Sequence, residues 1–315
     1  MNGLFMEYLN GSNTHDVSRA IKLLSEDHVV AVPSETVYGL AASAFSEHAC
    51  QKIFSVKKRP SDNPLIVHVA DIEMALTLVR FQKPLIDIAQ HFWPGPLTIV
   101  APRIKTTQLC AFVSAGLNTV AVRCPSHPLF RALINEVGPL AAPSANASGK
   151  PSPTRAEHIL QENLEGITAV LDGGACQGGL ESTVIGLRND DKITMYRPGM
   201  ISEDQFIPFG QVVKPEGHDA PSPGMRHKHY APAGRLLLNQ RTKGNNDFYI
   251  GFGHGEHVDF QLSSNCDLEE AAHLLFHALK VADNQMAKTI AVAPIPRTGL
   301  GATINERLER AATKF

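Results

Sequence analysis

The sequence has few of the features that mark membrane or secreted proteins. No apolar run in its 315 residues approaches the roughly 20 residues that cross a bilayer. The first ten residues, MNGLFMEYLN, lack the basic region and the apolar core of a signal peptide. We therefore expect a cytoplasmic protein that makes no membrane contact.

Cysteine is scarce, and its spacing favours no metal site or disulfide framework. The five cysteines lie far apart in the sequence, their number is odd, and no C-x-x-C pair occurs. Reduced, mostly buried thiols in the cytosol are the expected state.

Neither sign of charge is in excess, and aromatic residues are few. The chain has 29 basic and 31 acidic residues, a net charge of −2 and 6% aromatic residues. A protein built to bind nucleic acid usually carries a strong basic excess or stripe, so any contact with a polyanion must be local. The sequence also has no G-x-x-x-x-G-K-[ST] loop and no G-x-S-x-G elbow, which argues against a Walker-type nucleotide site and a serine hydrolase.

What is present is the composition and pattern of an α/β protein. Hydrophobic residues make up 43% and charged residues 19%, as in globular domains, and the length suggests two domains. Strands alternate with helices through the first two thirds, which predicts an α/β domain with a mixed sheet. Strand-like runs occupy 28–33, 64–69, 97–102, 119–125, 138–146, 167–174 and 182–187, and helical spacing covers 14–26, 47–58, 71–79, 84–92 and 128–137.

The pattern changes after about residue 206. Segment 207–233 holds five prolines, which preclude a regular helix or a central strand, and we interpret it as a linker or lid arm. A second α/β unit follows. We therefore predict a catalytic domain at 1–206, the arm at 207–233, and a small C-terminal domain at 234–315. The C-terminal domain should contain strands at 235–239, 248–253 and 289–296 and helices at 268–286 and 302–312.

Residues 53–69, IFSVKKRPSDNPLIVHV, join a basic cluster to a strand that contains a histidine. Lys57 and Arg59 form a K-x-R pair at the end of a helix, directly before a proline. Such a pair presents an ammonium and a planar guanidinium to a phosphate or carboxylate. On this stretch alone the alternative stays open that the cations only favour a helix C-terminus, and that His68 is a core histidine.

Three further segments favour an anion pocket. SETVYGLA (34–41) follows a strand, where open α/β sheets bind ligands, and GGLESTVIG (178–186) has the same glycines, hydroxyls and carboxylate. PSANASGKPSPT (143–154) offers small donors that a ligand can approach closely. Arg123 and Arg197 each end a β-rich run. Arg123 is followed by a cysteine and a proline, and Arg197 directly by a proline. Several such strand ends in one sheet suggest a shared pocket.

Taken in order, these segments resemble a known family. SETVYGLAASAF, KKRPSDNPLIVHV, WPGPLTIV, VAVRCP, APSANASGKPSPT, ESTVI and YRPG are similar to the YrdC-like domain of the threonylcarbamoyl-AMP synthases. SPGMRHKHYAP and GLGATINERLERAA look like the linker and C-terminal domain of the two-domain form. The resemblance implies a YrdC-like twisted open mixed sheet with helices, followed by a proline-rich linker and a small Rossmann-like α/β domain.

The resemblance also implies a reaction. Such enzymes, which are nucleotidyltransferases, join L-threonine, bicarbonate and ATP into threonylcarbamoyl-adenylate and release pyrophosphate. A separate transferase then modifies the adenosine next to the anticodon of certain tRNAs, so tRNA contact should be weak or indirect. Mg²⁺ would be held mainly by ATP and water rather than by protein ligands.

Positions that match the family's motifs carry the implied roles. Lys57 and Arg59 would be catalytic through their contacts with the ATP phosphates, and Tyr230 in the arm would cover the nucleotide. The expected ATP contacts are Lys57, Arg59, Asn63, Thr119, Ser144, Asn146, Ser152, Arg197 and Tyr230, and the expected threonine contacts are Thr36, His68, Arg123 and Ser182.

Three alternatives remain at this point. A locally basic cavity could hold an RNA backbone, which would make the chain an RNA-binding module. A carbamoyl-adenylate enzyme of hydrogenase maturation shares the YrdC-like domain, although its zinc-finger and acylphosphatase-like segments are missing here. A regulatory relative without turnover is the third, and the intact K-x-R and S-x-N motifs (S144-A-N146) argue against it.

Overall fold

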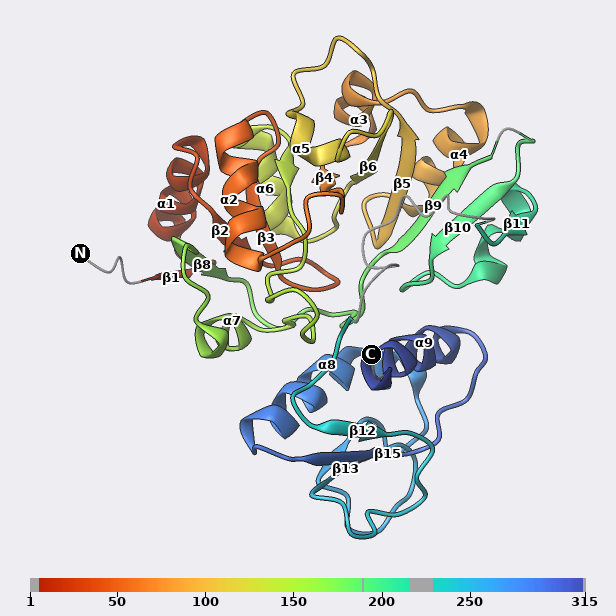
Figure 1. The fold of residues 1–315 in the computed structure, drawn as a ribbon. Helices are drawn as coiled ribbons and strands as arrows, with labels where there is room; N and C mark the ends of the chain where they lie inside the picture. Colours follow the sequence, from red (N-terminus) through yellow and green to blue (C-terminus); the bar gives the residue numbers. More distant parts are fainter. Residues whose placement is uncertain (1–5, 189, 216–228, 314–315) are drawn as a thin grey trace.

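The computed structural model describes residues 6–188, 190–215 and 229–313, which form a large and a small α/β domain (Figure 1). The large domain is built on an 11-stranded sheet with the order β1-β8-β2-β3-β7-β4-β6-β5-β9-β10-β11. Five of its neighbouring pairs are parallel and five antiparallel, so the sheet is mixed as predicted. The strands are β1 (Glu7–Asn10), β2 (Val30–Val32), β3 (Gly39–Ser43), β4 (Ile66–His68), β5 (Leu97–Pro102), β6 (Thr119–Arg123), β7 (Leu140–Ala141), β8 (Ala169–Asp172), β9 (Thr183–Leu187), β10 (Ile193–Arg197) and β11 (Val212–Val213).

Helices cover both faces of this sheet. Along β2, Val30 and Val32 pack with the side chains of α1 and α6, whereas Ala31 packs with those of α2 on the opposite face. Because successive side chains of a strand point to opposite faces, an unbroken apolar run such as this predicts a strand buried on both sides. The helices are α1 (Thr14–Ser25), α2 (Glu47–Lys57), α3 (Ile72–Leu78), α4 (Lys83–Phe92), α5 (Ala111–Ser114), α6 (Pro128–Val137), α7 (Ala156–Glu162) and the 3-10 helix η1 (Glu203–Phe209).

The small domain has a four-stranded sheet, all parallel, in the order β12-β15-β13-β14. Figure 1 shows α8 and α9 between this sheet and the large domain, so both helices reach the interface. The elements are β12 (Arg235–Leu237), β13 (Phe248–Gly251), β14 (Phe260–Gln261), α8 (Leu268–Asn284), β15 (Thr289–Val292) and α9 (Leu300–Ala312).

The structure differs from the prediction in several places, among them β3 (Gly39–Ser43) and α7 (Ala156–Glu162), which the sequence did not predict. The predicted strand 138–146 is a strand only at Leu140–Ala141, since Gly138 at φ 94° precedes it and Pro143 follows it. The last helix begins at Leu300 rather than 302. The predicted arm, 207–233, begins inside the large domain, because β11 pairs with β10 at the edge of the sheet.

Two predictions of the sequence fall partly or wholly outside what the structure tests. Nearly half of the arm, 216–228, lies outside the described residues. The Rossmann-like character of the small domain stays a prediction.

Among the residues described here, none of the helices combines the length and the apolar composition that crossing a membrane requires.

Candidate active site

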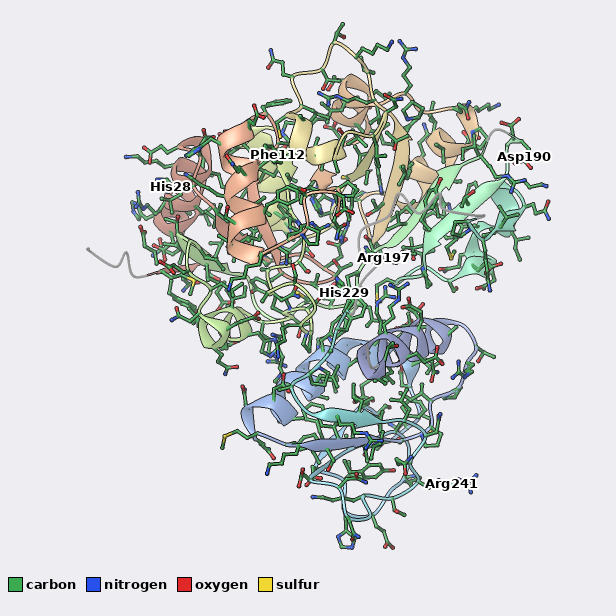
Figure 2. The ribbon with its side chains drawn as sticks, viewed as in Figure 1. His28, Phe112, Asp190, Arg197, His229 and Arg241 are labelled. Carbon is green, nitrogen blue, oxygen red and sulfur yellow. The ribbon has the colours of Figure 1, made fainter. Side chains whose placement is uncertain are left out.

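One cavity of the large domain collects three arginines from distant parts of the sequence. Its lining includes Arg59, Arg123 and Arg197, and we call it the arginine cavity. Figure 2 shows Arg197 and His229, another lining residue, where the large domain faces the small one. The other polar side chains of its wall are Ser34, Thr36, His68, Ser144, Glu181 and Ser182.

Sheet topology brings several of these residues to one edge. His68 and Arg123 are register partners at the carboxyl ends of the parallel strands β4 and β6. Ser182 precedes β9, and Arg197 ends its antiparallel neighbour β10. Strand ends that meet at one edge of an open α/β sheet form the usual ligand crevice, and here they bring together four residues that the sequence placed in one pocket.

Arg197 is buried and Arg59 is half-buried, and the hydrogen bonds of both cations go to neutral oxygens. Arg59 donates to the carbonyls of Asn63 (3.1 Å) and Pro64 (2.8 Å), and Arg197 donates to the Ser182 carbonyl (3.0 Å from Nη2). Burial, together with the charge of Arg197, lowers the pKa of Arg59 to about 10. Neither arginine forms an ion pair within the described residues, and removing an unpaired charge from water costs free energy. An anion that enters the cavity would pair with these cations and reduce that cost.

Lys57, the other cation of the K-x-R pair, points at the S-x-N turn. Helix α2 ends at Lys57, and Lys58 takes the left-handed conformation (φ 49°). The Lys57 ammonium donates to the carbonyl of Ser144 at 2.5 Å and to that of Asn146. Burial, then repulsion from Arg59, lowers the pKa of Lys57 to about 7. The two motifs found in the sequence are therefore joined directly, through the backbone of the second.

The four predicted threonine contacts all line the cavity. Arg123 donates to the hydroxyl of Thr36 at 2.9 Å and to Glu35 at 2.6 Å. The Ser182 hydroxyl is 2.7 Å from that of Thr98, at the start of β5. His68 Nδ1 has no hydrogen-bond partner among the described residues, and burial holds the pKa of His68 well below its ordinary value. A neutral imidazole with a vacant nitrogen can receive or donate one hydrogen bond to a polar ligand.

Six predicted site residues do not line the cavity in this structure. Four of them make backbone or wall contacts: Lys57 and Asn146 within the S-x-N turn, Ser152 with Glu181, and Asn63 through its carbonyl with Arg59. Thr119 is the first residue of β6, where it pairs with Pro102 of β5. Tyr230 is buried against Phe276 of α8, with ring centroids 5.3 Å apart. Their predicted roles stay predictions.

Sequence reasoning missed the carboxylates of the site and their partner in the small domain. Glu35 and Glu181 lie inside the SETVYGLA and GGLESTVIG segments, where a carboxylate was noticed but given no role. Glu181 pairs with Arg307 of α9, 126 residues further along the chain. The signal for the carboxylates was present in those segments, whereas nothing in the last helix singled out Arg307.

The described residues offer no protein cage for a metal ion. No group of three or more His, Cys, Asp or Glu side chains in 6–188, 190–215 and 229–313 is arranged to hold one.

Comparison with known proteins identifies the family. Residues 22–199 match the model of the Sua5/YciO/YrdC family, whose description reads telomere recombination. The chain belongs to this family. Residues 198–313 match the model described as the C-terminal domain of threonylcarbamoyl-AMP synthase. The resemblance inferred from the motifs is therefore confirmed, including its two-domain form.

Relatives match this family member over nearly its whole length. It is 37% identical to a threonylcarbamoyl-AMP synthase of Bacillus subtilis, over 98% of this chain and 96% of that protein. It is 35% identical to one of Pyrococcus abyssi, over 93% of each. The crystal structure of P. abyssi Sua5 complexed with L-threonine superposes with a TM-score of 0.88 at 31% identity, covering 98% of this chain and 97% of that one. The YrdC-like fold expected from the sequence is thereby confirmed.

Proposed function

We propose that this chain is a threonylcarbamoyl-AMP synthase that makes L-threonylcarbamoyl-adenylate and pyrophosphate from L-threonine, bicarbonate and ATP. The observation that carries the proposal is the convergence of Arg59, Arg123 and Arg197 on one cavity beside Thr36 and His68. The relatives that bear this name, and the L-threonine complex of the P. abyssi protein, support it.

The reaction needs cations in an enclosed space. The threonine amine adds to the carbon derived from bicarbonate, and loss of water leaves a carbamate. A carbamate oxygen then attacks the α-phosphorus of ATP, and the bond from that phosphorus to the pyrophosphate oxygen breaks. Two anions must approach each other in this step, so positioning and charge stabilisation supply most of the catalysis. Arg197 is buried and Arg59 is half-buried, and neither forms an ion pair among the described residues, so both fit this role.

The S-x-N turn would complete the phosphate cradle. Ser144 lines the cavity beside Arg59. The Lys57 ammonium donates two hydrogen bonds to carbonyls of the turn, so its third N–H can donate to a phosphate oxygen. In this proposal Asn63, Thr119, Asn146 and Ser152 also contact the nucleotide, directly or by holding its neighbours, and Tyr230 covers it so that water stays away from the adenylate. Mg²⁺ arrives with ATP.

Threonine would bind in the same cavity. Arg123 offers its guanidinium to the amino-acid carboxylate, while Thr36, His68 and Ser182 surround the rest of the small polar molecule. In the cytoplasm, the labile adenylate would pass to a tRNA threonylcarbamoyl transferase, so contact with tRNA would be weak or indirect.

The test is pyrophosphate release from ATP, bicarbonate and Mg²⁺ with L-threonine present, omitted or replaced by L-serine. We expect release that depends on threonine, and an adenylate whose mass is that of threonylcarbamoyl-AMP. Release that ignores threonine would point to carbamoyl transfer. Tight, salt-sensitive tRNA binding without any release would point to an RNA-binding module, and either result would overturn the proposal.

A further inference from the structure

Arg307 of the small domain is a fully buried cation at the boundary with the large domain. None of its side chain is exposed. Its Nε donates to Glu181 Oε2 at 2.9 Å, its Nη2 donates to the Pro198 carbonyl at 2.7 Å, and its Nη1 pairs with Glu306. The guanidinium carbon also lies 5.0 Å from the ring centroid of Tyr230. All three nitrogens are thus engaged, which fixes the plane of the guanidinium.

Glu181 connects this cation to the arginine cavity. It lines the cavity wall, and its Oε1 accepts a hydrogen bond from Ser152 at 2.6 Å while Oε2 faces Arg307. Burial would raise the pKa of Glu181, but Arg307, Arg197 and the Ser152 hydroxyl together lower it to about 2. A carboxylate at this wall would repel an incoming phosphate unless a nearby cation neutralised it.

The same guanidinium holds the chain next to Arg197. Pro198 follows Arg197 directly, and Gly199 packs so tightly that an added Cβ would lie 2.2 Å from the Thr183 nitrogen. Arg307 therefore spans two touching wall segments, one carrying Glu181 and Ser182 and the other carrying Arg197.

We propose that Arg307 is a positioning residue for the nucleotide site, through which the small domain neutralises Glu181 and fixes the wall that carries Ser182 and Arg197. The small domain would thus complete an ATP site that the large domain alone leaves with an unpaired carboxylate. This inference rests on the proposed function, because it takes the arginine cavity as the place where ATP binds.

The decisive experiment is a double-mutant cycle on the full chain. Affinity for a non-hydrolysable ATP analogue is measured by calorimetry, and the KM values for ATP and threonine are measured by pyrophosphate release. Arg307→Met should weaken ATP binding about tenfold or more, since it leaves a buried carboxylate unpaired at the wall. The KM for threonine should change less than the affinity for ATP, because Ser182 is the one proposed threonine contact on the wall segment that Arg307 holds, whereas Thr36, His68 and Arg123 lie on other segments.

The second mutation separates this role from simple domain docking. Glu181→Gln in the Arg307→Met background removes the unpaired charge, and ATP affinity should return to within about threefold of the wild type. Loss of domain docking would not be repaired by that change. A double variant as weak as Arg307→Met would overturn the proposal, as would wild-type affinity in Arg307→Met.

Two matched controls complete the design. Thr303→Val removes another contact of α9 with the large domain, the hydrogen bond from its hydroxyl to the Gly199 carbonyl at 3.1 Å. Arg297→Met removes an exposed Arg–Glu pair of the small domain, the one with Glu309. Arg297→Met should bind ATP as the wild type does, and Thr303→Val should lose less affinity than Arg307→Met, because it leaves the Glu181–Arg307 pair in place. A loss in Thr303→Val equal to that in Arg307→Met would assign the effect to docking and defeat the inference.

If Arg307→Met alone does not fold, the ATP affinity of Arg307→Lys tests the proposal instead. Lysine keeps the charge but lacks the fork that holds Glu181 and the Pro198 carbonyl together, so ATP affinity should fall about threefold or more with a normal melting temperature. Unchanged affinity in this variant would overturn the proposal. A wild-type chain that neither binds the analogue nor releases pyrophosphate would instead defeat the proposed function itself.

Discussion

The guanidinium of Arg123 and the carboxylate of Glu35 form a buried ion pair across 2.6 Å beside the arginine cavity. Only 5% of the Arg123 side chain and 11% of the Glu35 side chain are exposed. The same guanidinium donates to Thr36 and to the Gly95 carbonyl, at 2.9 and 3.3 Å. The carboxylate thus holds the guanidinium in a fixed orientation, with Thr36 and Arg123 both facing the cavity.

This orientation leads to a prediction for threonine. Arg123→Lys keeps the positive charge but loses the planar fork, so the KM for threonine should rise about tenfold while the KM for ATP stays within about twofold. The kinetics of threonine-dependent pyrophosphate release measure both. Arg131→Lys is the matched control, since Arg131 contacts only the Ala70 carbonyl in the hydrogen bonds of the structure and does not line the cavity. Equal KM values for threonine in the two variants would contradict the assignment of Arg123.

Arg59 should be needed for turnover rather than for folding. Arg59→Ala removes a half-buried cation that we propose contacts the phosphates, and it should lower kcat by about a hundredfold or more. The protein should keep its melting temperature within a few degrees, because the lost hydrogen bonds go to two backbone carbonyls near the turn after α2. Arg19→Ala, which breaks a half-exposed pair with Glu7, should leave kcat unchanged. A near-normal rate in Arg59→Ala would remove the phosphate assignment.

Tyr230 should stabilise the small domain. Its ring is 1% exposed and stacks on Phe276. Tyr230→Ala should therefore lower the free energy of unfolding by about 3 kcal/mol in denaturant melts. Tyr230→Phe keeps the ring and should cost less than about 1 kcal/mol. If Tyr230→Ala melted like the wild type, the packing described here would not hold in solution. If it also turned over and retained its adenylate normally, the lid role would be lost.

Acid should weaken the fold through Glu181. Its folded pKa of about 2 lies below the ordinary 4.5, so the unfolded chain takes up the proton first as the pH falls. The stabilisation is complete above about pH 4.5 and is lost as the pH falls towards about 2, and it amounts to about 3 kcal/mol.

The measurement is urea unfolding of the wild type and Glu181→Gln between pH 6 and pH 3. Other carboxylates titrate in both proteins, so the difference between the two curves isolates Glu181. That difference should shrink as the pH falls. Parallel curves would show that the carboxylate is not held ionised by Arg307 and Arg197.

Much of the fold followed from local patterns. The apolar run at 28–33 and the helical spacing at 47–58 became β2 and α2, because both signals depend on burial of side chains close in sequence. The run 138–146 misled the prediction, since its small apolar residues resemble a strand while Gly138 and Pro143 restrict pairing to Leu140–Ala141. Segment 207–233 looked like a linker, and only pairing with β10 showed that Val212–Val213 extends the large sheet.

The sequence by itself determined the chemical types at the site. Arginines at strand ends and small hydroxyl residues in glycine-rich turns suggested a shared anion pocket, and the family resemblance named the individual residues. Seven of these line one cavity: Thr36, Arg59, His68, Ser144, Arg123, Ser182 and Arg197. Only the tertiary structure decided which charges face each other. Lys57 holds the Ser144 carbonyl 87 residues away, and Glu181 meets Arg307 across 126 residues. The first contact depends on how distant segments of the large domain pack, and the second on how the two domains dock, and neither leaves a periodic signal in the chain.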